Sequence, residues 1–110
     1  MKLKKFNFKI VNSTNELAIH IIKNTKNKSG IVIAEKQKKG RGQYGKKWIS
    51  SRGNLFVSIF FPINMVKLSF KDLTKVNCLI VKKLLSGFYK NKISIKKPND
   101  LLINNMKISG

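Results

Sequence analysis

The chain has 110 residues, of which 42% are hydrophobic, enough for one small domain and too apolar for a disordered basic tail. No apolar run reaches the roughly 18–20 residues of a membrane span, and no apolar signal core follows the basic N-terminus. A membrane protein is therefore not expected. The single cysteine, Cys78, excludes an intramolecular disulfide and fits a reducing compartment. We expect a cytoplasmic protein in which Cys78 is a small core residue.

The charge is strongly positive. Twenty-four Lys and Arg against four Asp and Glu give +20, which ordinarily suggests nucleic acid as a partner. Nearly all the cations are lysines scattered along the chain, however, with arginine only at Arg41 and Arg52. Nucleic-acid binders more often concentrate their charge and use arginine. We interpret the lysines mainly as solvated surface and keep a small basic nucleic-acid-binding module as an alternative. DNA binding is not expected, because there is no helix-turn-helix pattern.

The first elements are a strand and a capped helix. Residues 5–11 alternate apolar and polar side chains, which predicts a half-buried strand. Ser13 and Glu16 have the spacing of a capping box, so Ser13 should cap a helix and Glu16 should reach back to its backbone. The apolar face of this helix would consist of Leu17, Ala18, Ile21 and Ile22. His20 has no second candidate ligand on this helix, and we expect a surface or boundary residue, not a metal ligand or a base.

Two predicted strands flank a glycine-rich loop. Residues 30–34 form a continuous apolar run typical of an interior strand, and residues 54–62 are apolar and β-branched up to Pro62. Between them, residues 40–48 read Gly-Arg-Gly-Gln-Tyr-Gly-Lys-Lys-Trp. Glycine permits positive φ and close backbone approach, and successive amides can form an anion-binding concavity. The loop is predicted to hold an anionic, phosphate-bearing ligand.

The second half predicts a helix and three strands. Ser69 and Asp72 begin the helix, whose buried stripe would consist of Leu73, Val76, Ile80, Leu84 and Phe88. Residues 92–96 predict a strand, and residues 101–108 predict a hairpin with an Asn104-Asn105 turn. The whole chain predicts an α+β fold, with a mixed or antiparallel sheet and flanking helices.

Four segments together resemble the biotin–protein ligase family. They are Ser13-Thr14-Asn15, the loop at residues 40–48, Ser50–Leu55 and Lys96-Lys97-Pro98-Asn99-Asp100. Lys107–Gly110 is also similar to the start of that family's Lys-x-x-Gly-Ile-Leu strand. The resemblance implies a biotin/lipoate ligase-like, class II synthetase-like catalytic domain. Residues 1–110 would be part of it, without its C-terminal half and C-terminal barrel domain. A homodimer or a complementing C-terminal half is a candidate partner.

The resemblance also implies a reaction. Biotin would be activated by Mg²⁺-bound ATP as biotinyl-AMP and passed to a lysine in the biotin carboxyl carrier domain of a carboxylase. Cations and backbone amides suit this chemistry, because the protein mainly positions anions and stabilises charge on the transferring phosphorus. A lipoate or octanoate ligase of the same fold is the nearest enzymatic alternative.

Roles in the family carry over to matching positions. Lys96 and Arg41 would be catalytic, with Lys96 at the biotin carboxylate and the α-phosphate. The residues expected to bind biotin or biotinyl-AMP are Ser13, Thr14, Asn15, Gln37, Gly40, Arg41, Gly42, Gln43, Trp48 and Lys96. Trp48 would close the loop near the adenylate or anchor it structurally. Gly45, Asn99 and Asp100 are further candidates, although a Pro-Asn-Asp turn alone explains the last two.

Two positions depart from the family's pattern. Gln43 stands where a second arginine is usual in the loop, and Lys97 stands where a tryptophan usually precedes Pro-Asn-Asp. Glutamine supplies hydrogen bonds but no charge, so weaker retention of the adenylate is predicted. Lys97 removes an aromatic packing group.

Overall fold

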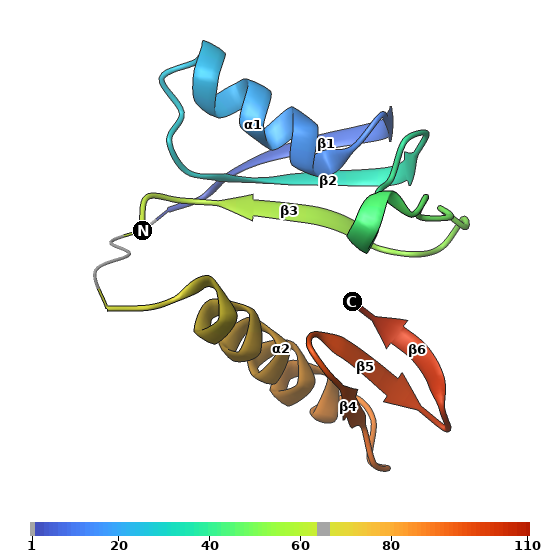
Figure 1. The fold of residues 1–110 in the computed structure, drawn as a ribbon. Helices are drawn as coiled ribbons and strands as arrows, with labels where there is room; N and C mark the ends of the chain where they lie inside the picture. Colours follow the sequence, from blue (N-terminus) through green and yellow to red (C-terminus); the bar gives the residue numbers. More distant parts are fainter. Residues whose placement is uncertain (1, 64–66) are drawn as a thin grey trace. The chain divides into compact units, whose positions relative to one another are not determined.

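The protein folds as two compact units. A computed structural model describes residues 2–63 and 67–110 (Figure 1). The first unit is Met1–Ile63 and the second is Asn64–Gly110. Each unit has its own hydrophobic cluster and its own small sheet.

The first unit is a three-stranded mixed sheet with a helix on one face. Its elements are β1 (Lys4–Val11), α1 (Thr14–Asn24), β2 (Gly30–Gln37), the short 3-10 turn η1 (Gln43–Gly45) and β3 (Phe56–Phe60). The strand order is β1-β2-β3, with β1 parallel and β3 antiparallel to β2. Figure 1 shows α1 along one face of this sheet. Because β1 and β2 are parallel, the turn into α1 and the exit from β2 lie at the same edge.

The core of this unit joins α1 to the sheet. Ala18 and Ile21 are buried against Val32 and Phe60. Phe6 completes the cluster by stacking on Phe60, with ring centroids 6.4 Å apart. The predicted apolar face of the first helix is therefore confirmed, and it fixes the helix N-terminus at the sheet edge.

The second unit packs one helix on an antiparallel sheet. It contains α2 (Phe70–Ser86), β4 (Ser94–Lys96), β5 (Asp100–Ile103) and β6 (Met106–Ser109), in the order β4-β5-β6. The predicted Asn104-Asn105 turn between β5 and β6 is confirmed. Both residues have positive φ, 49° and 62°, as the hairpin turn requires.

The predicted buried stripe of the second helix is wrong. Leu84 is 63% exposed and Phe88, just beyond the helix, is 91% exposed. The buried residue of α2 is Cys78, packed with Val81 and Leu85 against Ile93 and Leu101. Both sides of this helix carry apolar residues, so periodicity alone could not identify the side that meets the sheet. Cys78 is a buried free thiol, as predicted.

Several strand ends and one side-chain contact at a helix cap differ from prediction. Strand β2 continues beyond the apolar run, and the amides of Lys38 and Lys39 still bond the carbonyls of Val11 and Asn12. Strand β3 is shorter than residues 54–62, and β4 is shorter than residues 92–96. Ser13 caps α1 as predicted, but the carboxylate of Glu16 pairs with Arg41 instead of returning to the cap.

No helix in the described part of the chain is long and apolar enough to cross a membrane.

Candidate functional site

The site begins at the N-terminus of α1. Ser13 caps the helix, and its Oγ accepts a hydrogen bond from the amide of Glu16 at 3.3 Å. Ser13 and Thr14 are the buried polar residues of the described chain, 8% and 4% exposed. The first amides of a helix lack intrahelical acceptors and carry positive potential, so they are ready to meet an acceptor or an anion.

The end of β2 supplies that acceptor. The carbonyl oxygen Oε1 of Gln37 accepts from the Thr14 amide at 2.8 Å and lies 3.2 Å from the Thr14 hydroxyl. The same hydroxyl lies 2.9 Å from Ser58 Oγ on β3. Three elements thus meet in one polar cluster above the apolar core, and Gln37 is brought together with Thr14 across 23 positions of sequence.

The glycine-rich loop folds back on itself as a small hairpin. The Trp48 amide bonds the Gly40 carbonyl at 2.8 Å, and the Gly42 amide bonds the Lys46 carbonyl at 2.6 Å. Tyr44 and Gly45 make the reversal with positive φ, 57° and 72°. The amides of Gly42 and Trp48 are therefore occupied within the loop. The predicted concavity of successive free amides is wrong for these two groups.

Gly40 is required at the base of this hairpin. A Cβ built there would lie 2.9 Å from Gln37 Nε2 and 3.1 Å from Trp48 Cβ. Any side chain would displace either the amide of Gln37 or the closing tryptophan. Gly42 is less crowded, with 3.6 Å to the nearest atoms.

Arg41 ties the loop to α1. Its Nη2 pairs with Glu16 Oε1 on the first turn of the helix. The two side chains are 66% and 43% exposed, and exposed pairs of this kind stabilise by only about 0–1 kcal/mol. A bound anion could therefore replace the carboxylate at little cost, so Arg41 is held near the cluster and remains available to a ligand.

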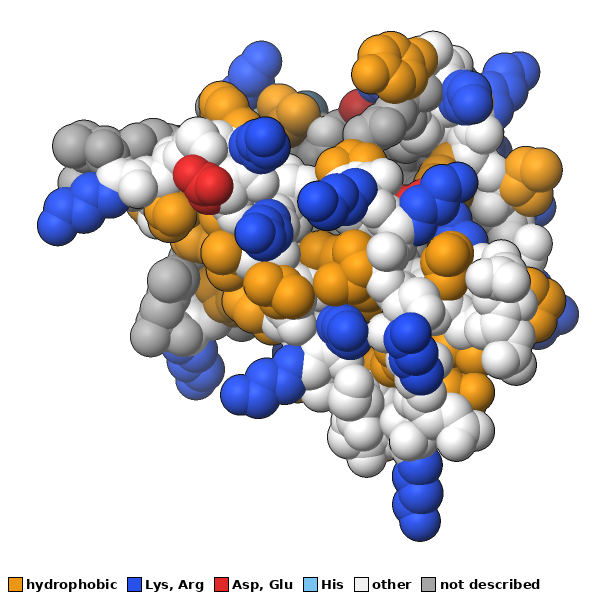
Figure 2. All heavy atoms as spheres, turned by 60° about the horizontal axis from the view of Figure 1, so that its bottom comes forward, with side chains coloured by type: hydrophobic (Ala, Val, Ile, Leu, Met, Phe, Trp, Pro, Cys, Tyr) orange, Lys and Arg blue, Asp and Glu red, His pale blue; other side chains and the backbone are white. Residues whose placement is uncertain are grey.

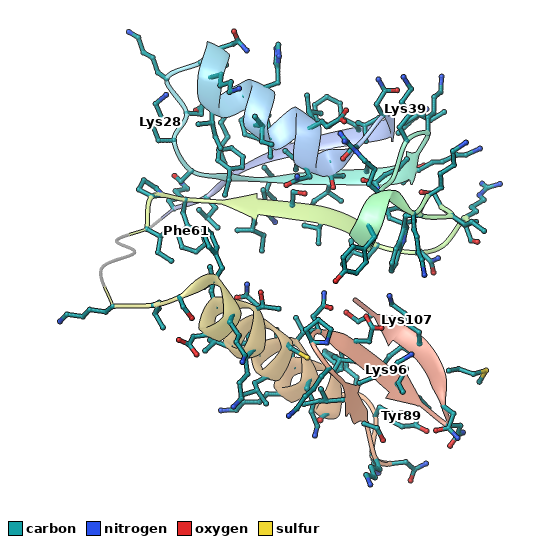
Figure 3. All side chains as sticks on the ribbon, viewed as in Figure 1. Lys28, Lys39, Phe61, Tyr89, Lys96 and Lys107 are labelled. Atoms are coloured by element: carbon teal, nitrogen blue, oxygen red, sulfur yellow. The ribbon has the colours of Figure 1, made fainter. Side chains whose placement is uncertain are left out.

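Asn15, another predicted binding residue of the first unit, lies at the edge of this polar cluster. Asn15 follows Thr14 on the first helical turn and is exposed. A shallow pocket lies beside the cluster and is lined by Val11, Asn12, Ser13, Glu16, Leu17 and His20. His20 is exposed, as predicted, and its ring nitrogen lies 3.2 Å from Asn24 Nδ2. Figure 3 shows Lys39 where the chain leaves β2 for the loop.

The remaining predicted residues lie in the second unit. Lys96 is the last residue of β4 and pairs in register with Asp100 on β5, across the turn that contains Asn99. The Asp100 carboxylate binds Lys107 Nζ at 3.0 Å. Figure 3 shows Lys96 and Lys107 on this small sheet. The participation of Lys96, Asn99 and Asp100 in one site with the loop stays a prediction.

Figure 2 draws one face of the molecule with its side chains coloured by type. On the face drawn in Figure 2, lysine and arginine side chains are separated by apolar and neutral ones. On this face, the spacing is typical of solvated lysines and differs from the continuous basic patch that tracks a phosphate backbone.

Sequence reasoning missed the contacts of two residues at this site. Ser58 is the one hydroxyl in the run Phe56–Phe60, and a polar residue inside an apolar strand was the available signal. Glu16 was assigned only to the cap. Its position one turn from the helix start also puts it within reach of a cation, but no sequence spacing links it to Arg41.

Comparisons with known proteins agree on one family. The model of the Biotin/lipoate A/B protein ligase family matches residues 7–110. The Bifunctional ligase/repressor BirA of Escherichia coli (strain K12) is 31% identical over 102 residues, covering 92% of this chain and 32% of the relative. The chain thus spans about a third of that relative's length.

Solved structures confirm the predicted α+β fold. The biotin protein ligase from Aquifex aeolicus in complex with biotin and ATP matches with a TM-score of 0.80 at 30% identity, over 97% of this chain and 44% of that one. The biotin acetyl coenzyme A carboxylase synthetase from Helicobacter pylori with bound biotinylated ATP matches with a TM-score of 0.78 at 22% identity, over 97% and 52%. Because its identity is only 22%, the Helicobacter pylori structure supports the fold and nothing further.

Proposed function

Because the chain belongs to the biotin/lipoate A/B protein ligase family, we propose that it takes part in ATP-dependent biotinylation through biotinyl-AMP. The observation that carries the proposal is the polar cluster at the N-terminus of α1, where Thr14, Gln37 and the base of the Gly40–Trp48 hairpin meet. The Aquifex aeolicus ligase that this chain resembles binds biotin and ATP. The same two substrates are proposed here, with Mg²⁺ arriving on the ATP.

The proposed reaction has two steps. A carboxylate oxygen of biotin bonds to the α-phosphorus of ATP, the α–β phosphoanhydride bond breaks, and pyrophosphate leaves. The amine of a lysine on a carboxyl carrier domain then attacks the acyl carbon of biotinyl-AMP. An amide forms, AMP leaves with the electron pair of the broken C–O bond, and the amine loses its proton to solvent.

The residues of this chain would stabilise negative charge on the substrates and hold the substrates in position. Arg41 would exchange Glu16 for the phosphate of the adenylate, and Lys96 would neutralise charge at the carboxylate and the α-phosphorus. The hairpin above Gly40 would cover the mixed anhydride and exclude water, which otherwise hydrolyses it. Trp48, fixed to Gly40 through its backbone amide, would set where that cover closes.

Pyrophosphate exchange tests the proposal directly. With labelled pyrophosphate, the chain is expected to exchange label into ATP when biotin is present and not when lipoate or octanoate is present. Exchange with lipoate would instead favour the lipoate ligases, which share the family model. Absence of exchange, combined with salt-sensitive RNA or DNA binding, would favour the basic nucleic-acid-binding module.

The departure at position 43 gives a second prediction. Replacing Gln43 by arginine adds a charged hydrogen bond to the phosphate, so biotinyl-AMP should dissociate about tenfold more slowly. Stopped-flow displacement by excess biotin measures this rate. Ile49→Arg adds the same charge just beyond the loop, at a side chain that is 84% exposed, and should leave the rate unchanged. If biotinyl-AMP dissociated equally fast from Gln43→Arg and from the unmodified chain, the assignment of position 43 to the adenylate-binding site would be contradicted.

A further inference from the structure

Strand β1 has a free edge in the described part of the chain. The sheet order is β1-β2-β3, so β2 pairs with one side of β1 and no described strand pairs with its other side. An outer strand presents a row of unpaired backbone N–H and C=O groups, to which another chain can add as a further strand. With eight residues, Lys4–Val11, β1 is long enough to hold an extended peptide.

The face of β1 that meets α1 is apolar and remains partly open. Phe6 belongs to the cluster beneath α1 and stacks on Phe60. Phe8 and Ile10 follow Phe6 at alternate positions, so they share its face of the sheet. Unlike Phe6, which is half-buried, they are 39% and 54% exposed. Apolar surface is thus uncovered directly beside the free edge.

The opposite face of β1 is basic. Lys5, Asn7 and Lys9 alternate with the apolar residues, and all three are exposed. Neither lysine forms an ion pair within the described residues, and the strand contains no acidic residue. Opposite charges on neighbouring strands stabilise their pairing. A partner strand that carries carboxylates on this face is therefore favoured.

The same lysines disfavour a second copy of this chain as the partner. If two β1 strands paired antiparallel about Asn7, Lys5 of each strand would lie opposite Lys9 of the other. Like charges directly opposite each other are destabilising, and lysine on an edge strand is a common protection against self-association. This protection is selective, because it repels a basic strand and attracts an acidic one.

We propose that the free edge of β1 binds an extended peptide segment of a partner protein, in which apolar and acidic residues alternate. The segment adds to the sheet as a further strand. Its apolar side chains lie beside Phe8 and Ile10, and its carboxylates lie beside Lys5 and Lys9. Backbone hydrogen bonds supply affinity, and the two different faces set register and specificity. This interaction does not depend on the proposed ligase activity.

Fluorescence anisotropy with the full chain and labelled, capped hexapeptides tests the alternation. Val-Glu-Val-Glu-Val-Glu is expected to bind about tenfold more tightly than Val-Val-Val-Glu-Glu-Glu, which has the same composition but cannot place its carboxylates on one face. Ser-Glu-Ser-Glu-Ser-Glu should bind as weakly as the block peptide, because it offers no apolar side chain to Phe8 and Ile10. Equal binding of all three peptides would indicate plain attraction to a chain of charge +20 and would overturn the inference.

Charge reversal and hydrogen exchange locate the bound peptide. Saturating Val-Glu-Val-Glu-Val-Glu should slow amide exchange in residues 4–11, because it pairs with the free backbone groups. The combined Lys5→Glu and Lys9→Glu variant should lose the tenfold preference for the alternating peptide. The combined Lys71→Glu and Lys75→Glu variant changes the net charge equally, at exposed positions of α2, and should keep that preference.

Two results would overturn the inference even if the charge-reversed strand failed to fold, because both are measured on the unmodified chain. The first is peptide-induced protection on β3, β4 or β6 without a change on β1. The second is a dimer of the free chain in analytical ultracentrifugation whose residues 4–11 are protected from exchange, since the edge would then hold a second copy. Circular dichroism confirms that each variant compared is folded.

Discussion

Replacing Lys96 by methionine is expected to lower the rate of biotin-dependent pyrophosphate exchange by about 10²–10³-fold, the usual effect of removing a group that stabilises transition-state charge. Lys96 ends β4, is exposed, and forms no ion pair within the described residues. The neighbouring carboxylate of Asp100 is bound to Lys107 instead, at 3.0 Å. The Lys96 ammonium is therefore available to an anionic substrate.

The kinetic pattern distinguishes this role from simple binding. Charge on the transferring phosphorus grows in the transition state, so kcat should fall more than the affinity for biotin. Lys92→Met removes an exposed lysine just before the same strand and should leave both parameters nearly unchanged. If Lys96→Met raised only the biotin KM, Lys96 would be a ground-state contact. If it changed neither parameter, Lys96 would have no place in the site.

The sequence predicted those features of the fold that depend on local chemistry. The cap at Ser13, the apolar face of α1 and the Asn104-Asn105 turn are each determined by a few neighbouring residues, and all three are confirmed. The strand ends were less predictable. Pairing between β1 and β2 continues to Gln37 through backbone bonds that do not depend on side-chain polarity.

The polar cluster shows what sequence reasoning could not supply. Gln37 was assigned to the site by resemblance alone, whereas its bonds to Thr14 depend on the parallel pairing of β1 and β2. Ser58 lies on β3 and contacts Thr14 of α1, although the two residues are 44 positions apart in the sequence. The pair of Arg41 with Glu16 likewise depends on how the hairpin folds back. Contacts made across such distances follow from topology, which propensities and spacing do not encode.

Leu101 gives the largest expected effect on stability. It is fully buried, 0% exposed, in the cluster that joins α2 to β5. Leu101→Ala removes its apolar contacts and leaves a cavity, so the free energy of unfolding should fall by about 2–5 kcal/mol. Denaturant unfolding followed by circular dichroism measures the change. A loss of this size is a large part of the roughly 5–15 kcal/mol that stabilises an ordinary domain.

Leu84 is the matched control. The same substitution at Leu84 tests which of the two apolar faces of α2 is buried. The stripe predicted from the sequence includes Leu84, but its side chain is 63% exposed, and Leu85 packs on the sheet instead. Leu84→Ala should change the free energy of unfolding by less than about 0.5 kcal/mol, as surface substitutions usually do. If Leu84→Ala cost as much as Leu101→Ala, residues outside this cluster would have to bury Leu84. The stripe Leu73, Val76, Ile80 and Leu84 would then be a second packed face of α2, as its apolar periodicity alone suggests.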